Sequence, residues 1–252
     1  PKLGPPLREG SAVDRLDEVD AADRLSYVYA GVAATREQLA DDIPLIGFCG
    51  APFTLASYAC EGGPSRSFIH TKTLMYSDPG AWHALMEKLV RGLSGYLDGQ
   101  VRAGCQAIQI FDSWVGALGP ADYAEFAAPH SKALIDGFKA SFPEIPLIHF
   151  GTGTGQLLEQ VQAAGGDVIG VDFQTDLASA RLRLGEDQPV QGNLEPVVLC
   201  GPADYVCTRA KAVLEANAGR PGHIFNLGHG ILPPTPVDNV RRLIDFVHEQ
   251  TS

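Results

Sequence analysis

The sequence contains no long hydrophobic run and comparatively few basic residues. No apolar stretch among its 252 residues approaches the roughly 18 residues that a membrane-spanning helix needs. Its 19 lysines and arginines are outnumbered by 30 aspartates and glutamates, which gives a net charge of −11 at pH 7. A nucleic-acid-binding protein needs a basic surface to contact phosphates. We therefore expect neither a membrane nor a nucleic acid as a partner.

Cysteines are few and scattered, and common cofactor motifs are absent. The five cysteines include no C-x-x-C pair; they are Cys49, Cys60, Cys105, Cys200 and Cys207. Unpaired thiols are typical of a reducing compartment, and the first residues do not resemble a signal peptide, so we expect a cytoplasmic protein. The sequence also lacks a P-loop, an H-E-x-x-H motif and a G-x-G-x-x-G motif at a strand-to-helix junction. We therefore expect no bound metal and no cofactor.

Short apolar runs alternate with helical patterns along the chain. Hydrophobic residues make up 45% of the sequence and charged residues 19%, which is typical of a globular protein, and we treat residues 1–252 as a single domain. Runs flanked by glycine or proline predict six buried strands, at 45–48, 107–111, 147–150, 168–171, 190–191 and 224–226. Apolar spacing and stop signals predict helices at 20–41, 81–102, 122–140 and 155–165, and one after Pro236.

Repeated strand–helix units predict a parallel sheet with right-handed crossovers. The pattern alone leaves two α/β folds open, a doubly wound sheet and a barrel, because six strands do not close the usual eight-stranded barrel. Both folds bind ligands beyond the carboxyl ends of the strands. Glycines and polar residues follow nearly every predicted strand, which indicates a site there, although single residues such as Asp112 and Asn193 could be helix caps.

Three residues near these strand ends are candidates for ligand contact. Tyr58 falls on a short predicted helix after the first strand, where its hydroxyl could face a ligand or belong to a core tyrosine. Ser113 follows the second strand and could bind a carboxylate or cap a helix. His229 lies between two glycines after the last strand, where it could bind a ligand, move protons or be structural. The residues alone leave these alternatives open.

Four segments together resemble the uroporphyrinogen decarboxylase family, and the similarity extends over essentially all 252 residues. They are GFCGAPFTLASYACEGG at 47–63, QIFDSWVGALGP at 109–120, VQGNLEP at 190–196 and FNLGHGILPPTP at 225–236. The resemblance implies a (β/α)8 TIM barrel and a homodimer that acts without a cofactor. The implied reaction removes four acetate carboxyl groups from uroporphyrinogen III and yields coproporphyrinogen III, a step of haem and porphyrin biosynthesis.

The resemblance also implies roles for individual residues. Tyr58 and His229 would be the catalytic pair. The substrate-binding residues implied in the same way are Phe48, Cys49, Gly50, Tyr58, Ser113 and His229. The implied mechanism is driven by a proton: a pyrrole carbon is protonated, the cationic ring accepts the electrons of the breaking bond, and carbon dioxide leaves.

The sequence departs from the family at one place. The family carries RQAGR-type and FSD-type motifs in an N-terminal part, and neither occurs here. We therefore expect six of the eight barrel strands, with the first two β-α units missing, and a truncated, non-catalytic remnant of that enzyme is one alternative. Another is the related corrinoid-dependent methyltransferases, which use a zinc set of His and Cys. Against it, His149 is followed by Phe150 and Gly151, so no H-x-C is present.

Overall fold

The computed structural model describes residues 4–17 and 21–251. Within them, six parallel strands form one sheet in the sequential order β1 to β6. The strands are β1 (Ile46–Gly50), β2 (Ala107–Asp112), β3 (Leu147–Gly151), β4 (Val168–Gly170), β5 (Val190–Leu194) and β6 (His223–Leu227). The six predicted strands are thus confirmed, although β5 continues to Leu194 instead of ending at Gln191.

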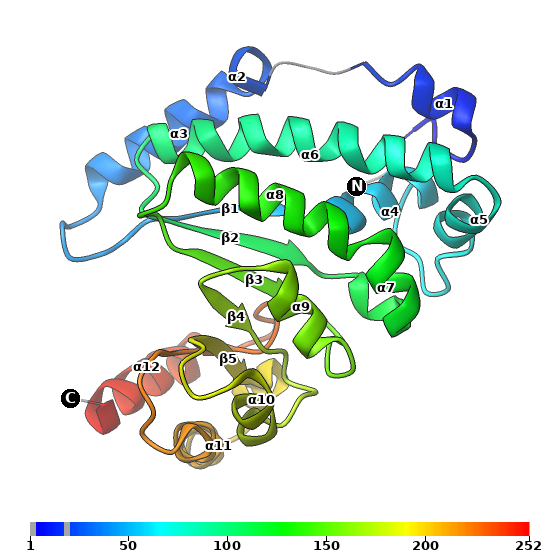
Figure 1. The fold of residues 1–252 in the computed structure, drawn as a ribbon. Helices are drawn as coiled ribbons and strands as arrows, with labels where there is room; N and C mark the ends of the chain where they lie inside the picture. Colours follow the sequence, from blue (N-terminus) through cyan, green and yellow to red (C-terminus); the bar gives the residue numbers. More distant parts are fainter. Residues whose placement is uncertain (1–3, 18–20, 252) are drawn as a thin grey trace.

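Helices connect the strands and cover one face of the sheet (Figure 1). The N-terminal and central helices are α1 (Gly10–Asp14), α2 (Ala21–Arg24), α3 (Ser26–Gln38), α4 (Pro52–Glu61), α5 (Ile69–Ser77) and α6 (Pro79–Arg102). The later ones are α7 (Pro120–Phe126), α8 (Ala128–Ser141), α9 (Leu158–Ala164), α10 (Leu177–Leu184), α11 (Ala203–Asn217) and α12 (Val237–Thr251), with short 3-10 helices η1 (Val115–Ala117) and η2 (Pro196–Cys200). No helix in the described ranges is long and apolar enough to cross a membrane.

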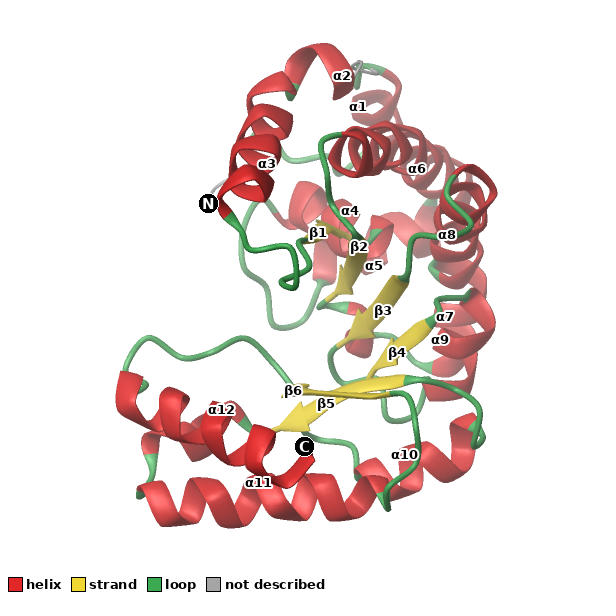
Figure 2. Ribbon diagram, turned by 90° about the vertical axis from the view of Figure 1, so that its left-hand side faces the viewer, coloured by secondary structure: helices red, strands yellow, loops and turns green. Residues whose placement is uncertain are grey.

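The sheet is strongly curved. Figure 2 shows the strands following an arc from β1 to β6, with the helices on its outside. In a flat sheet β2 and β5 would be about 14 Å apart, since neighbouring strands are spaced by about 4.8 Å. Yet Gln191 Nε2 on β5 donates to Gln109 Oε1 on β2 at 3.3 Å. This hydrogen bond spans the concave face, which shows that the sheet bends as part of a barrel wall does and is not an open doubly wound sheet.

Two predicted helices are interrupted. The helix expected at 122–140 is two helices, α7 and α8, which meet at Ala127. Pro129 stands in the first turn of α8, where its missing N–H cannot continue the hydrogen bonds of α7. The helix expected at 20–41 is likewise α2 and α3, separated at Leu25 (φ −113°, ψ 18°), and it ends at Gln38. Asp20 lies outside the described residues.

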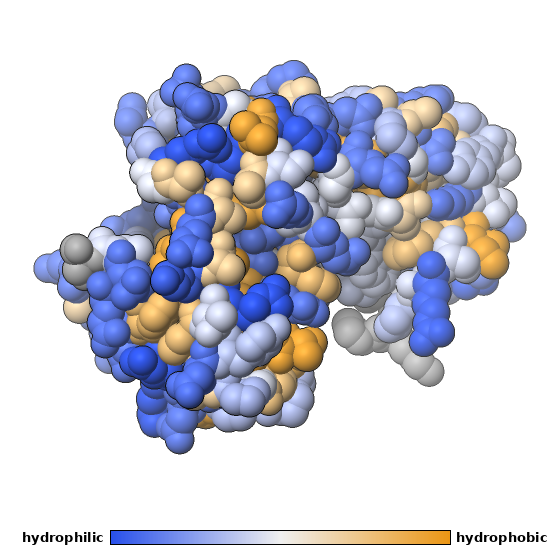
Figure 3. Space-filling view, turned by 90° about the horizontal axis from the view of Figure 1, so that it is seen from below, coloured by the Kyte–Doolittle hydropathy of each residue, from blue (hydrophilic) through white to orange (hydrophobic). Residues whose placement is uncertain are grey.

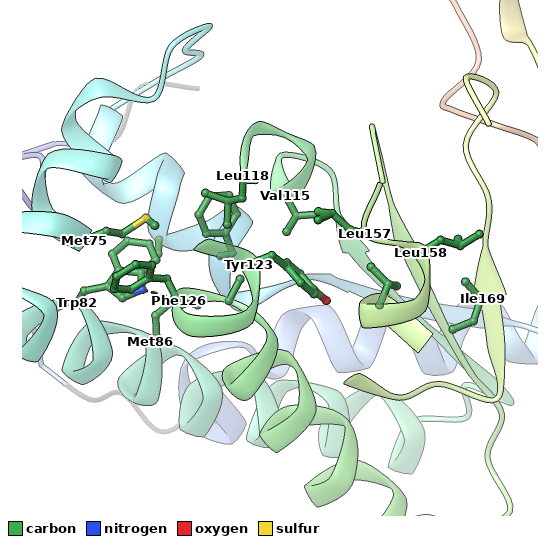
Figure 4. Close-up of a cluster of buried hydrophobic side chains, with 14 of the residues drawn as sticks. Met75, Trp82, Met86, Val115, Leu118, Tyr123, Phe126, Leu157, Leu158 and Ile169 are labelled. Atoms are coloured by element: carbon green, nitrogen blue, oxygen red, sulfur yellow. Dashed lines mark hydrogen bonds between the residues drawn. The ribbon is translucent and has the colours of Figure 1, made fainter. Parts of the chain in front are cut away.

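The largest buried cluster joins the outer helices to the sheet. Trp82 and Met86 of α6 pack with Phe126 of α7, and the Trp82 indole N–H donates to the Phe126 carbonyl at 2.9 Å. Figure 4 shows Tyr123 in the middle of this cluster, with its hydroxyl directed away from Trp82 and Met86. The cluster extends to Ile169 on β4, so one continuous core connects α6 and α7 with the centre of the sheet.

A side chain of α6 forms hydrogen bonds with backbone groups at the outer edge of β1. The carbonyl of Leu45 accepts from the N–H of Gln106, and the N–H of Ala51 donates to the carbonyl of Phe111. Alternate residues along β1 therefore bond to β2, and the N–H and C=O of Phe48, which lies between, point away from β2. Gln100 of α6 bonds to both of them: its Oε1 accepts from Phe48 N–H and its Nε2 donates to Phe48 C=O, each at 3.0 Å. The carboxamide of Gln100 therefore takes the place of a neighbouring strand.

The glycine at position 47 makes room for this contact. A Cβ atom there would lie 2.8 Å from Gln100 Oε1 and 2.8 Å from the Cys105 sulfur. Any larger side chain would displace Gln100 from the edge of β1. The position of Phe48 thus depends on Gly47 and Gln100 together.

Replacement of Gln100 tests this edge contact. Gln100→Leu keeps most of the side-chain volume but leaves Phe48 N–H and C=O without their partner. We expect the free energy of unfolding to fall by about 1 to 3 kcal/mol, measured by urea denaturation. Gln250→Leu, the same exchange at an exposed position of α12, is the control and should change stability by less than about 0.5 kcal/mol. Equal stability of Gln100→Leu and wild type would show that Phe48 does not depend on this bond.

Candidate active site

The loops that follow the strands pack against one another at the carboxyl end of the sheet. A Cβ atom at Gly116, in η1 after β2, would lie 2.3 Å from Thr152 C=O in the loop after β3. A Cβ atom at Gly228, after β6, would lie 2.3 Å from Phe173 N in the loop after β4. Both positions require glycine because backbone meets backbone there. The loops after β2 and β3, and those after β4 and β6, therefore pack against each other backbone to backbone along this rim.

Asp172 ties several of these loops together. It is fully buried in the loop after β4. One carboxylate oxygen accepts from Gly153 N–H in the loop after β3, and the other accepts from the Thr175 hydroxyl at 2.9 Å. Asn193 on β5 donates its side-chain amide to the carbonyls of Asp172, at 2.9 Å, and Thr175, at 2.6 Å. Asn193 therefore ties β5 to the loop after β4 and is not a helix cap.

Tyr58 and Ser113 lie on adjoining segments of this rim. Tyr58 is half-buried on α4, and its ring stacks on Trp114 with 3.8 Å between ring centroids and 33° between planes. Ser113 immediately precedes Trp114 and is also half-buried. Neither hydroxyl forms a hydrogen bond within the described residues, and the residue that caps η1 is Trp114. Ser113 is therefore not a helix cap, and both hydroxyls have hydrogen-bonding capacity left for a ligand.

Asp112 occupies the last position of β2 and is fully buried. Its Oδ1 accepts from the Thr54 hydroxyl at 2.9 Å, whereas its Oδ2 has no partner among the described residues. Burial raises the pKa of this carboxyl to about 7, an effect that the Thr54 hydrogen bond only partly opposes. Asp112 also raises the pKa of the Tyr123 phenol, whose burial has the larger effect. Asp112 is thus a buried acid directly beside Ser113, and it is joined to the first turn of α4 through Thr54.

His229 lies on the loop after β6 and is exposed. Its Nδ1 accepts from the Gly230 N–H at 2.8 Å, so Nδ1 carries no proton in this arrangement and Nε2 does when the ring is neutral. Gly228, on its other side, is held against Phe173 and donates its N–H to the Leu194 carbonyl at 2.8 Å. The backbone before His229 is thus anchored, while its imidazole remains accessible.

Phe48, Cys49 and Gly50 are the remaining predicted site residues, and all three line a cavity of about 840 Å³ at the edge of β1. Helices α2, α3 and α6 form most of its other walls, with Leu55 of α4 and residues 16–17; Tyr58, Ser113 and His229 do not line it. Phe48 is 59% exposed and its ring contacts Phe111 edge-on at 6.0 Å. The Cys49 thiol is buried in the core, and burial raises its pKa to about 12, so it is a neutral, apolar group.

An aromatic row crosses the concave face below the rim. The ring of Phe111 on β2 contacts Phe48 on β1 at 6.0 Å and Phe150 on β3 at 5.8 Å, both edge-on. Successive residues of a strand point to opposite faces, so His149 points to the other side. There its Nδ1 lies 3.1 Å from the carbonyl of Gly165, and burial lowers the pKa of its imidazole to about 4. His149 therefore faces the helices and not the concave side of the sheet.

Residues 4–17 and 21–251 contain no group of three His, Cys, Asp or Glu side chains arranged to hold a metal ion. Sequence reasoning did not find Thr54 or Trp114, the two residues that connect Tyr58 with Asp112. A weak signal was present for Thr54, because it precedes Tyr58 by four residues and therefore shares its face of the helix. The partnership of both with residues after β2 depends on the fold.

Comparisons with known proteins agree with the motifs. The uroporphyrinogen decarboxylase (URO-D) family model matches residues 1–250. The uroporphyrinogen decarboxylase of Sorangium cellulosum (strain So ce56) is 50% identical over 248 residues, which are 98% of this chain and 70% of that protein. A uroporphyrinogen decarboxylase of Thermus thermophilus is 45% identical over 249 residues, 99% of this chain and 72% of that protein.

Among solved structures, a methyltransferase from Methanosarcina mazei superposes with a TM-score of 0.78. It is 20% identical, and the match covers 93% of this chain and 67% of that one, a likeness that shows the fold alone. An arc of parallel strands with helices outside and a polar rim at its carboxyl edge defines an enzyme-like scaffold of the (β/α)-barrel class. The chain belongs to the uroporphyrinogen decarboxylase family.

The buried acid Asp112 leads to a prediction about stability and pH. The unfolded chain releases this proton near the ordinary carboxyl pKa of 3.8, whereas the folded protein retains it up to about pH 7. The wild type therefore loses stability through Asp112 as the pH rises from about 4 to about 7. We expect Asp112→Asn to gain stability relative to wild type across this range, on the order of a few kcal/mol in total, as measured by urea denaturation at several pH values. A difference that does not change with pH would contradict a buried, titrating Asp112.

Proposed function

We propose that this protein decarboxylates uroporphyrinogen III at the rim on the carboxyl edge of its sheet. One observation carries the proposal: all four family-like segments lie at this edge, in a chain that matches the family model over residues 1–250. Relatives at 45% to 50% identity that bear the name uroporphyrinogen decarboxylase support the same reaction. The products are coproporphyrinogen III and four molecules of carbon dioxide.

We assign the contacts with the reacting pyrrole to Tyr58, Ser113 and His229. The hydroxyls of Tyr58 and Ser113 and the Nε2 of His229 are the polar groups of this set that have no partner within the described residues. Each can therefore donate a hydrogen bond to a substrate carboxylate without breaking a bond in the protein. Such donors orient the acetate group and stabilise charge as it develops.

The chemistry needs a proton and an electron sink but no bound cofactor. Protonation of a pyrrole carbon makes the ring cationic. The bond between the acetate methylene and its carboxylate then breaks, its electron pair moves into the ring, and carbon dioxide leaves. Reprotonation of the methylene and loss of the ring proton leave a methyl group. Tyr58 and His229 are the residues to which we assign catalytic roles in these steps.

The aromatic row of Phe48, Phe111 and Phe150 supports a tetrapyrrole as the ligand. It offers an apolar surface on the concave side of the sheet, next to a polar rim. A macrocycle with carboxylates around its edge combines the same two properties. Because the chain carries a net charge of −11, hydrogen-bond donors at the rim must offset the repulsion of the anionic substrate. Phe48 would contact the substrate from β1 and Gly50 would leave room for it, whereas the thiol of Cys49, a contact expected from the sequence, points into the core.

The family resemblance also leads us to propose a homodimer in the cytoplasm. Figure 3 shows hydrophobic residues exposed at several places between hydrophilic ones on the face seen from below. Exposed apolar side chains are compatible with a partner surface, and sedimentation of the purified protein measures its oligomeric state. A monomer at micromolar concentration would contradict the dimer but not the reaction.

The reaction is tested by anaerobic incubation with uroporphyrinogen III and chromatography of the products after oxidation to porphyrins. The assay uses the full-length product of the gene. We expect coproporphyrinogen to accumulate, and Tyr58→Phe to lower kcat/KM by roughly tenfold to hundredfold, which corresponds to one hydrogen bond to a charged group.

Tyr205→Phe is the matched control, because Tyr205 is an exposed tyrosine on α11 whose hydroxyl accepts from the nearby Arg209 at 3.2 Å. It should retain the wild-type rate. Unchanged substrate after incubation with the wild type would refute the proposed reaction. Full activity of Tyr58→Phe would refute only the role of this residue.

A further inference from the structure

Helix α4 contacts the segment after β2 at two points. The first is a set of hydrogen bonds around Thr54, and the second is the stacking of Tyr58 on Trp114. Thr54 and Tyr58 are four residues apart on α4 and so lie on the same face of the helix. Asp112 and Trp114 flank Ser113 on the other segment. The two contacts therefore hold both Tyr58 and Ser113.

The hydrogen-bonded contact has a defined direction. The Thr54 hydroxyl donates to Asp112 Oδ1 at 2.9 Å and accepts from Trp114 N–H at 3.2 Å. A hydroxyl has one proton, so the carboxyl group of Asp112 decides where that proton points and leaves the oxygen lone pairs of Thr54 for Trp114. Thr54 is 4% exposed and Asp112 is fully buried, so water does not compete strongly for these bonds.

The aromatic contact starts from the same tryptophan. Trp114 packs against Tyr58 at 3.8 Å between centroids, and against Phe68 edge-on at 5.2 Å. Phe68 has a left-handed backbone (φ 52°) and its N–H donates to the Ser65 hydroxyl at 3.0 Å. The indole is thus held by two rings, while its backbone is held by Thr54. A shift of the Trp114 backbone would move the ring on which Tyr58 rests.

We propose that Thr54 and Asp112 are positioning residues for the reaction, which act through Trp114 to fix the phenol of Tyr58 and the hydroxyl of Ser113. The proposal rests on the proposed function, because it takes Tyr58 as a catalytic group and Ser113 as a substrate contact. Neither Thr54 nor Asp112 needs to touch the substrate. Their effect is on the geometry of groups that do, and small displacements of such groups lower rates strongly.

Stability alone does not account for this arrangement. Asp112 Oδ2 has no partner among the described residues, and burial of an incompletely hydrogen-bonded carboxyl group opposes folding. The raised pKa of Asp112 reflects that cost. A valine in place of Thr54 would fill a similar volume without requiring a partner. The acid and the hydroxyl are thus better explained by what they orient than by the stability they add.

The test compares Thr54→Val, which loses the hydroxyl, with Thr54→Ser, which keeps it. We expect Thr54→Val to lower kcat by roughly tenfold with KM changed less than about twofold, because the bound substrate meets a displaced Tyr58. Thr54→Ser should restore most of the rate. The near-ultraviolet circular dichroism of the stacked Tyr58–Trp114 pair should weaken in Thr54→Val and return in Thr54→Ser.

Thr71→Val is the matched control for the spectrum. Thr71 is also fully buried, and its hydroxyl donates to a carboxylate, that of Glu61, at 3.0 Å. This variant should lose a similar amount of stability but keep the near-ultraviolet signal of the Tyr58–Trp114 pair. Any change in that signal specific to Thr54→Val then reports position and not general loosening of the fold.

The outcomes separate the two proposals. If Thr54→Val keeps both the wild-type kcat and the wild-type spectrum, Thr54 is only structural and the inference is overturned. A lower kcat without a spectral change, or without recovery in Thr54→Ser, overturns it as well. If the wild type does not decarboxylate uroporphyrinogen, the proposed function fails, whereas the spectra still decide whether Thr54 positions Trp114. Asp112→Leu, which removes the acceptor of the Thr54 hydroxyl, offers a second route, with the same spectral change expected.

Discussion

The carboxylate of Asp172 is the contact on which the carboxyl edge of the sheet depends. It is buried where loops from several strands converge, and it accepts from a backbone N–H after β3 and from a hydroxyl of its own loop. Its backbone carbonyl accepts from Asn193 of β5. Loops alone are held weakly, because their backbone groups lack the regular partners of helices and strands. The carboxyl group and backbone carbonyl of Asp172 together join the loop after β3, the loop after β4 and strand β5.

The rim and the concave face offer different kinds of contact to a large anionic ligand. Side chains alternate along a strand, so Phe111 and Phe150 point to the concave side. Ile110 and His149 point to the helices on the other side. Apolar contact thus comes from the strands and polar contact from the loops. The bond between Gln109 and Gln191 across the arc shows that curvature brings distant strands within reach of one ligand. The same bend that packs the core therefore shapes the site.

The strands were predictable because a buried parallel strand is a short apolar run, whatever it packs against. The breaks within helices were harder to predict. Pro129 indicates a break, but the apolar spacing continues on both sides of it and indicates a single helix. Contacts between residues far apart in the sequence could not be predicted from it. Gln100 bonds to Phe48 across 52 positions and Thr54 to Asp112 across 58, and no local pattern connects them. The candidates Tyr58, Ser113 and His229 came from motif resemblance, whereas their supports came only from the fold.

Two buried aspartates, one at the end of β2 and one after β4, illustrate how hydrogen bonding separates structural from adjustable groups. Asp172 has a donor on each carboxylate oxygen, so its position is fixed. Asp112 has a donor on one oxygen only, and burial raises its pKa to about 7. A carboxyl group with such a pKa gains or loses its proton near neutral pH at little cost in free energy. The fully bonded acid therefore holds the rim, whereas the half-bonded acid exchanges its proton near neutral pH.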